Sequence, residues 1–197
     1  LLSLVKDVDE FIIGSAARYI DDVDFFSQLY EQFEEHTKTE AHKLDYKSPR
    51  TSSEILNFSL DDNNVPVVNY LINNKNVRPS RNALLEVRVN GCFGQFVCRK
   101  NLTPEIVRKL VECGADVNVF DEILGSEKHG KNLLMYAVEN NDFEMVKTLI
   151  ELGSDINAED ENGNKIDFYV NKCDNEEIKN FLRRNYKKGI KIFSIQP

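Results

Sequence analysis

The sequence predicts an all-α protein, a helical solenoid of about four to five stacked helix pairs whose first and last units are divergent caps. Three observations predict this fold. Short apolar helices recur at a fixed interval, and two of them end in nearly the same polar motif. The 197 residues also combine 41% apolar with 29% charged residues, which is the balance of a folded globular protein.

The recurring helices are three segments with the same order of apolar and polar residues. They are VVNYLI at 67–72, IVRKLV at 106–111 and MVKTLI at 145–150. Their central valines, Val68, Val107 and Val146, lie 39 residues apart in both intervals. The apolar spacing within each segment predicts a short helix with one buried face.

Two of these helices are followed by nearly identical residues, ECGADVN at 112–118 and ELGSDIN at 151–157. Gly114 and Gly153 can adopt the left-handed backbone conformation that ends a helix. We therefore expect a sharp turn after each of these helices.

This order of helix, Gly-Ala-Asp-Val-Asn or Gly-Ser-Asp-Ile-Asn motif, turn and second short helix resembles the ankyrin repeat, a unit of about 33 residues. The best copy runs from Gly130 to Asn157. It matches the family at its glycine and at core positions of both helices, namely Leu134, Ala137, Val146, Leu149 and Ile150. It departs where the family has Thr, Pro and His, at Asn132, Leu133 and Met135, so the usual side-chain bonds between neighbouring turns are in doubt.

The earlier units are more divergent. We expect a first pair of helices within residues 10–35, with a core of Ala17, Phe26, Leu29 and Tyr30. A second unit over 53–77 aligns with the best copy without gaps. In the segment 81–103, Cys98 falls on the small-residue position of Ala137, but Gly91 and Gly94 leave the inner helix poorly specified.

A last, shortened unit follows Asn157, and its apolar residues are Ile166, Phe168, Ile178, Phe181 and Leu182. Its polar outer side suits a cap, because an end unit must be made soluble. The predicted organisation is a divergent helical segment over 1–50, ankyrin-like repeats over 51–185 and a basic tail over 186–197.

The turn between Asn118 and Gly130 is longer than its counterpart between Asn157 and Gly163. In an ankyrin-like stack such turns project along one rim, so the resemblance implies additional contact surface here. Ile123 and Leu124 are apolar residues within this turn. They either contact a partner or fold back onto the stack, and the sequence leaves both alternatives open.

The chain has a net charge of −8, and its charged residues are distributed unevenly along the sequence. Residues 139–177 contain twelve acidic and three basic residues. This acidic stretch either favours a partner with a basic surface or is ordinary solvated surface. Nucleic acid is not an expected partner of so acidic a chain. Apolar and polar residues alternate over 189–197, as in a strand. This segment either pairs with a sheet edge or lies along its own domain.

No catalytic motif for phosphate loops, dinucleotides, serine hydrolases or zinc proteases is present in the sequence. A thiol nucleophile formed by Cys92 or Cys98 with His129 is conceivable, but the core position of Cys98 favours a buried structural thiol. The cysteine and histidine spacings match no zinc pattern. We therefore expect no enzyme activity, no cofactor and no metal.

The resemblance implies a non-catalytic module that binds a partner protein through its concave face and the tips of its turns. The contact positions it implies are Asp61, Asp62, Glu122, Ile123, Leu124, Lys131, Glu139, Asn140, Glu161, Asn162 and Asn164. The alternative is a target-recognition domain of a larger enzyme or of a secreted effector. A small inhibitory protein is a third possibility without a specific motif.

Localisation follows from what the sequence lacks. No apolar run approaches the length of a membrane span, and acidic residues occur too early for a secretory signal. The cysteines have the sparse spacing of reduced thiols. We expect a cytoplasmic protein, or one in the host cytosol if it is a secreted effector; because residue 1 is Leu1, a longer parent protein stays open.

Overall fold

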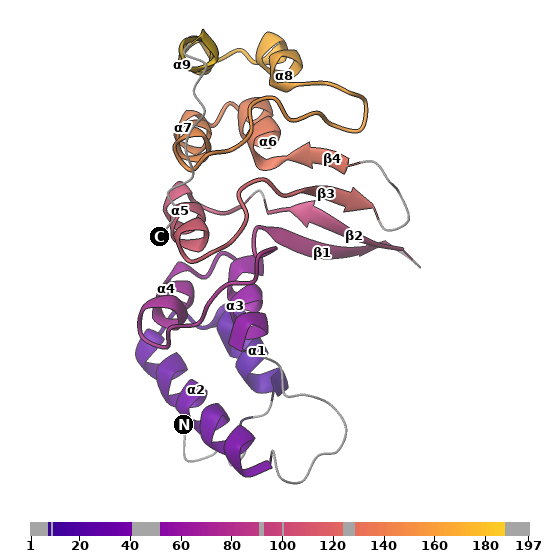
Figure 1. Cartoon of the computed structure of the whole chain (residues 1–197). Helices are drawn as coiled ribbons and strands as arrows, with labels where there is room; N and C mark the ends of the chain where they lie inside the picture. The colour runs from indigo at the N-terminus through magenta and orange to yellow at the C-terminus, as the bar shows by residue number, and fades with distance from the viewer. Residues whose placement is uncertain are drawn as a thin grey trace. The chain divides into compact units, whose positions relative to one another are not determined.

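The structure, a computed structural model, describes residues 8, 10–40, 52–90, 93–99, 101–123 and 129–187 (Figure 1). The chain divides into two compact units, Leu1–Ser80 and Arg81–Pro197. Helices predominate in the described residues, as the predicted helical solenoid requires.

The first unit consists of two helix pairs, α1 (Glu10–Tyr19) with α2 (Val23–Glu40) and α3 (Ser52–Asp61) with α4 (Val65–Asn73). Helix α1 packs on α3, and α2 packs on α4. The expected first pair is therefore present, and its predicted core residues, Ala17, Phe26, Leu29 and Tyr30, are all buried. In that core, Tyr70 of α4 meets the rings of Phe26 and Tyr30 edge-on.

Asn64 joins the two pairs of the first unit. Its side-chain oxygen accepts a hydrogen bond from the backbone N–H of Val67 and so caps α4. Its amide nitrogen donates to the carbonyls of Ala17 and Ile20 at the end of α1, at 3.1 and 3.0 Å. Since Asn64 is buried, this one amide satisfies backbone groups of both pairs that would otherwise be costly to bury.

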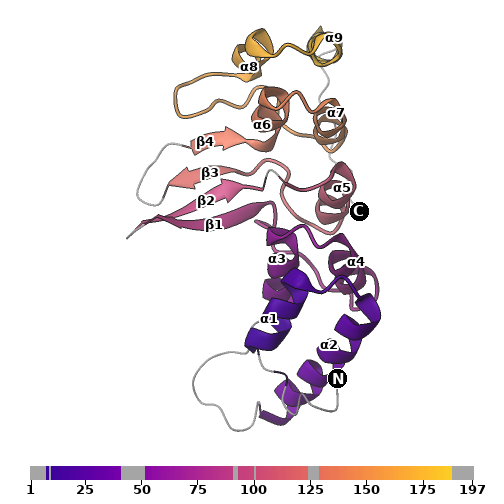
Figure 2. The same cartoon turned by 180° about the vertical axis from the view of Figure 1, so that it is seen from behind.

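The second unit contains two rows of helices and a sheet (Figures 1 and 2). The inner row is α6 (Leu133–Glu139) and α8 (Ile166–Lys172), and the outer row is α5 (Pro104–Glu112), α7 (Phe143–Glu151) and α9 (Glu176–Lys187). Neighbouring helices within each row are in contact, and α6 also contacts α7.

The core of the second unit matches the predicted register. The best-copy residues Leu134, Ala137, Val146, Leu149 and Ile150 are all buried, and so are Ile178 and Leu182 of the last unit. Phe168 differs, because 40% of its surface is exposed although the sequence placed it among the apolar residues of the last unit.

The segment 81–103 does not form the inner helix that the repeat alignment assigned to it. It forms a hairpin of two antiparallel strands, β1 (Leu85–Asn90) and β2 (Phe93–Cys98). The physical reason is visible in the sequence Leu-Glu-Val-Arg-Val at 85–89, which alternates apolar and charged residues with the period of a strand. Cys98 is nevertheless buried, as its alignment with Ala137 predicted.

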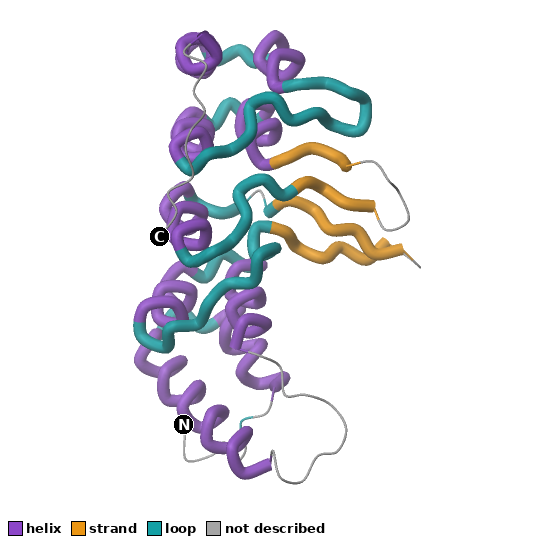
Figure 3. Tube along the Cα trace, in the orientation of Figure 1, coloured by secondary structure: helices purple, strands orange, loops and turns teal. Residues whose placement is uncertain are grey.

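The enlarged turn after Asn118 is a second hairpin, made of β3 (Phe120–Ile123) and β4 (His129–Asn132). Strand β2 pairs with β3, so the two hairpins form one antiparallel sheet in the order β1-β2-β3-β4 (Figure 3). The pairing of β3 with β4 is irregular between Phe120 and Glu122. Gly130 lies close to this irregularity, since a Cβ atom on it would be 2.7 Å from the Cβ of Asp121.

The helix ends are formed by the same local hydrogen bonds in successive units. Gly114 and Gly153 have φ of 108° and 89°, which confirms the predicted left-handed turns. The residue after each of them, Ala115 or Ser154, donates its N–H to a carbonyl five residues earlier. At the end of the inner helix α6, Asn141 has the same role with φ of 57°, because asparagine tolerates this conformation better than most residues.

Within Arg81–Pro197, asparagine side chains link the turns of neighbouring repeats, where the family uses threonine and histidine. Asn118 accepts a hydrogen bond from the N–H of Asp155 at 2.8 Å. Asn132 is buried, and its side chain caps α6 by accepting from the N–H of Met135 at 2.9 Å. An amide oxygen therefore supplies the capping bond that a threonine hydroxyl supplies elsewhere.

Candidate functional site

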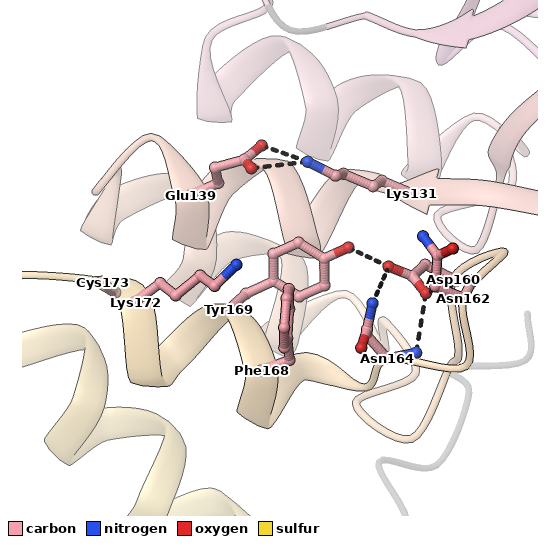
Figure 4. Close-up of a pocket in the computed structure, with 9 residues that line it drawn as sticks. All are labelled: Lys131, Glu139, Asp160, Asn162, Asn164, Phe168, Tyr169, Lys172 and Cys173. Carbon is pink, nitrogen blue, oxygen red and sulfur yellow. Dashed lines mark hydrogen bonds and ion pairs between the residues drawn. The ribbon is translucent and has the colours of Figure 1, made fainter.

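A pocket of about 250 Å³ lies between the unit that begins at β4 and the last unit of the described chain (Figure 4). One side is formed by Lys131 of β4 and Glu139 at the end of α6. The turn before α8 contributes its polar residues, Asp160, Asn162 and Asn164.

The opposite side of the pocket is formed by α8 and the residue that follows it. Phe168, Tyr169, Lys172 and Cys173 line this side. The thiol of Cys173 is buried and lies 3.0 Å from the Oδ1 of Asn141. Two successive repeats therefore form the walls of the pocket, and the turn before α8 connects them at its base.

Asp160 organises the turn. Its Oδ1 accepts hydrogen bonds from the backbone N–H groups of Asn162 and Asn164, both at 2.8 Å. Its Oδ2 accepts from the Asn164 amide at 3.0 Å and from the hydroxyl of Tyr169. Burial tends to raise the pKa of Asp160, but the bonds from Tyr169, Asn164 and Asn162 outweigh burial and hold that pKa below its usual value.

Lys131 spans the two units. Its ammonium group bonds both carboxylate oxygens of Glu139, at 2.7 and 2.8 Å (Figure 4). The same ammonium lies 5.3 Å from the ring centres of Tyr136 and Tyr169, within the range of cation–π attraction. Lys131 is thus held in place by one carboxylate and two aromatic rings.

The pair of Asp160 and Tyr169 has a counterpart one unit earlier. Asp121, at the irregular point of β3, accepts a hydrogen bond from the hydroxyl of Tyr136 and another from the N–H of Cys98 at 2.7 Å. Tyr136 and Tyr169 are 33 residues apart, which is the length of one repeat. Each inner helix therefore presents a tyrosine that is bonded to the aspartate of its own turn.

These tyrosines are expected to make the fold sensitive to alkaline pH. Burial, and then the hydrogen bond to an aspartate, raise the pKa of Tyr136 and of Tyr169 well above the usual value. Between the usual pKa near 10 and the raised one, the unfolded chain loses phenolic protons that the folded chain keeps, so stability falls as pH rises. Urea midpoints at about pH 8 and about pH 10.5 should differ less in Tyr169→Phe than in the unsubstituted chain. An identical difference in both would contradict this role of Tyr169.

The family model for ankyrin repeats in three copies matches residues 56–160, just over half of the chain. The chain belongs to the ankyrin repeat family. Ankyrin repeats are generally protein–protein interaction modules and are typically non-catalytic. No curated protein matches the chain.

Four of the contact positions that the ankyrin resemblance implied, Lys131, Glu139, Asn162 and Asn164, line the pocket. Glu161 is exposed in the same turn, and Asn140 is exposed at the end of α6. The structure thus brings six of the predicted residues to neighbouring positions on two successive ankyrin units.

The remaining predicted positions lie elsewhere. Asp61 and Asp62 each form an ion pair with Arg18 at 2.8 Å within the first unit. Glu122 is exposed on β3. Leu124 lies outside the described residues, and so do the side chain of Ile123 and the strand-like end at 189–197.

The residues of α8 that line the pocket were missed as contact positions. The sequence predicts a cap for this last unit and places Phe168 among its apolar residues. The 33-residue spacing of Tyr136 and Tyr169 gave no such signal, because it places Phe168 at the position of Met135, which is buried.

Within the described ranges, no group of three His, Cys, Asp or Glu side chains is placed to hold a metal ion. The buried thiol of Cys98 faces the carbonyls of Val119 and Lys131, while Cys92 and the side chain of His129 lie outside the described residues. No described helix is both long enough and apolar enough to cross a membrane.

Proposed function

We propose that this chain is a non-catalytic module that binds a partner protein through the pocket face, defined as Lys131, Glu139, the turn 160–164 and the exposed side of α8. The observation that carries the proposal is the pocket itself. It joins two ankyrin units, and predicted contact positions occupy much of its wall. Such a surface contacts a partner with side chains from several repeats at once.

The partner is proposed to carry a basic surface. On the last described helices and turns, three exposed carboxylates take part in no ion pair with a described residue, namely Glu161, Asp167 and Asp174. Uncompensated negative charge of this kind accelerates association with a positive surface and loses its effect as salt is raised.

The proposed function includes a division of the chain into three parts. The binding part is residues 51–185, with a helical segment over 1–50 before it and a basic tail over 186–197 after it. A cytoplasmic setting is proposed on the sparse cysteine spacing.

Two charge reversals of equal size test the binding role. Glu161 in the pocket-face turn and Glu144 on the outer helix α7 are both exposed, and neither has an ion-pair partner among the described residues. We expect Glu161→Arg to reduce capture of the main partner from a native lysate about tenfold, whereas Glu144→Arg leaves capture near the unsubstituted level. Circular dichroism should show both variants folded.

The matched pair separates local contact from general charge. Equal losses in both variants would mean that the partner responds only to net charge and not to the pocket face. Capture that is unchanged between low and high salt would contradict a basic partner.

A further inference from the structure

Most of the charged groups that line the pocket are already satisfied within the chain. Glu139 has both of its oxygens on the ammonium of Lys131. Asp160 accepts four hydrogen bonds and is buried. The two carboxylates of the lining therefore have little capacity left for a cationic ligand.

Lys172 is the exception. Its ammonium lies 3.9 Å from the ring centre of Phe168, and no carboxylate among the described residues is within ion-pair distance of it. Figure 4 shows the side chain of Lys172 extending beside Tyr169 on the pocket wall. An ammonium held over an aromatic ring and lacking a counter-ion remains able to bind an anion.

Further hydrogen-bond donors face the same space. The side-chain amide of Asn162 lines the pocket and makes no hydrogen bond with any described residue. Lys131 has three N–H donors, of which its two bonds to Glu139 use two. Phe168 adds apolar surface, because 40% of it is exposed.

From this balance of free donors and occupied acceptors, we infer that the pocket binds the carboxylate of an aspartate or glutamate side chain of the partner protein. The carboxylate bonds Lys172, and the methylene groups beside it lie against Phe168. This inference rests on the proposed function. It adds that an otherwise basic partner surface carries one acidic side chain at the pocket.

Of the acidic residues that line the pocket, Glu139 is paired with Lys131, and Asp160 is enclosed by its four hydrogen bonds. Glu161 lies in the same turn but does not line the pocket. Its charge is exposed to water and salt, which weaken its repulsion of a bound carboxylate. The long-range field of the acidic residues and the short-range contact in the pocket therefore select different features of one partner.

The test uses the full chain, isotope-labelled for NMR, and three capped peptides. These are N-acetyl-Leu-Glu-Leu-amide, its Gln counterpart and its phosphoserine counterpart. The Glu peptide should shift the backbone amides of residues 162–173 and bind about threefold more tightly than the Gln peptide. Lys172→Gln should remove this preference. Lys147→Gln is the control, because Lys147 is exposed on α7 and does not line the pocket.

The outcomes distinguish this inference from the proposed function. Equal affinity of the Glu and Gln peptides, with the shifts still at 162–173, overturns the carboxylate assignment and leaves the pocket face as a binding site. Retention of the preference in Lys172→Gln also overturns the assignment. Phosphoserine binding more than about tenfold tighter assigns the pocket to phosphate instead. Shifts confined to the outer helices would contradict both proposals.

Discussion

Replacing Leu149 by alanine is expected to lower the free energy of unfolding by about 2–5 kcal/mol. Leu149 is completely buried on α7, the helix that contacts α5, α6 and α9. Replacing its isobutyl group by a methyl group leaves a cavity in this core, and the surrounding structure relaxes only partly. Urea unfolding followed by circular dichroism measures this loss.

The matched control is Lys147→Ala on the same helix. Lys147 is exposed, so its substitution should change the free energy of unfolding by less than about 0.5 kcal/mol. If Leu149→Ala cost as little as this control, Leu149 would not be a stacked core residue, and the assigned repeat register would be wrong.

Replacing Asp160 by alanine is expected to destabilise the chain by about 2–4 kcal/mol. The substitution removes the acceptor of four hydrogen bonds and leaves the hydroxyl of the buried Tyr169 without this partner. Since bonding holds the pKa of Asp160 low, its contribution is present above the usual carboxyl pKa and is lost as pH falls through the lowered one. The cost of the substitution should therefore shrink in strong acid.

Asp155 provides the control for Asp160. It occupies a similar turn but is exposed, and its carboxylate accepts the N–H of Asn157. Asp155→Ala should cost about 0.5–1 kcal/mol. Similar costs for both variants, measured by urea unfolding at neutral pH, would mean that the turn at Asp160 does not organise the last unit.

The helical part of the fold was predictable because its signals are local. The two glycines that end helices and the apolar spacing of the best copy each depend on a few neighbouring residues, and the valines spaced by 39 residues show that the local pattern recurs. All of these agree with the structure, including the left-handed conformations of Gly114 and Gly153.

The sheet is not predicted by the repeat alignment, which assigns a helix to a segment whose residues alternate with the period of a strand. Cys98 aligns with a helix position, although residues 85–89 alternate with the period of a strand. The enlarged turn was located correctly, but its pairing with β2 depends on a register between distant segments, Gln95 with Ile123 and Phe96 with Glu122. No local pattern specifies that register.

The candidate site was predictable in position but not in its internal bonding. Family positions indicated Lys131, Glu139 and the turn before α8. Which charges pair with each other depends on distances across the fold. Asp61 and Asp62 share Arg18, which precedes them by more than forty residues, whereas Lys172 has no carboxylate partner in the described part of the chain.

We propose that this ankyrin repeat chain meets its partner at the pocket face. The most direct test is NMR mapping of the captured partner onto the isotope-labelled full chain. We predict that the largest changes fall on the amides of Lys131, Glu139 and residues 160–172. Changes confined to α5, α7 and α9, with the pocket face unaltered, would contradict the claim.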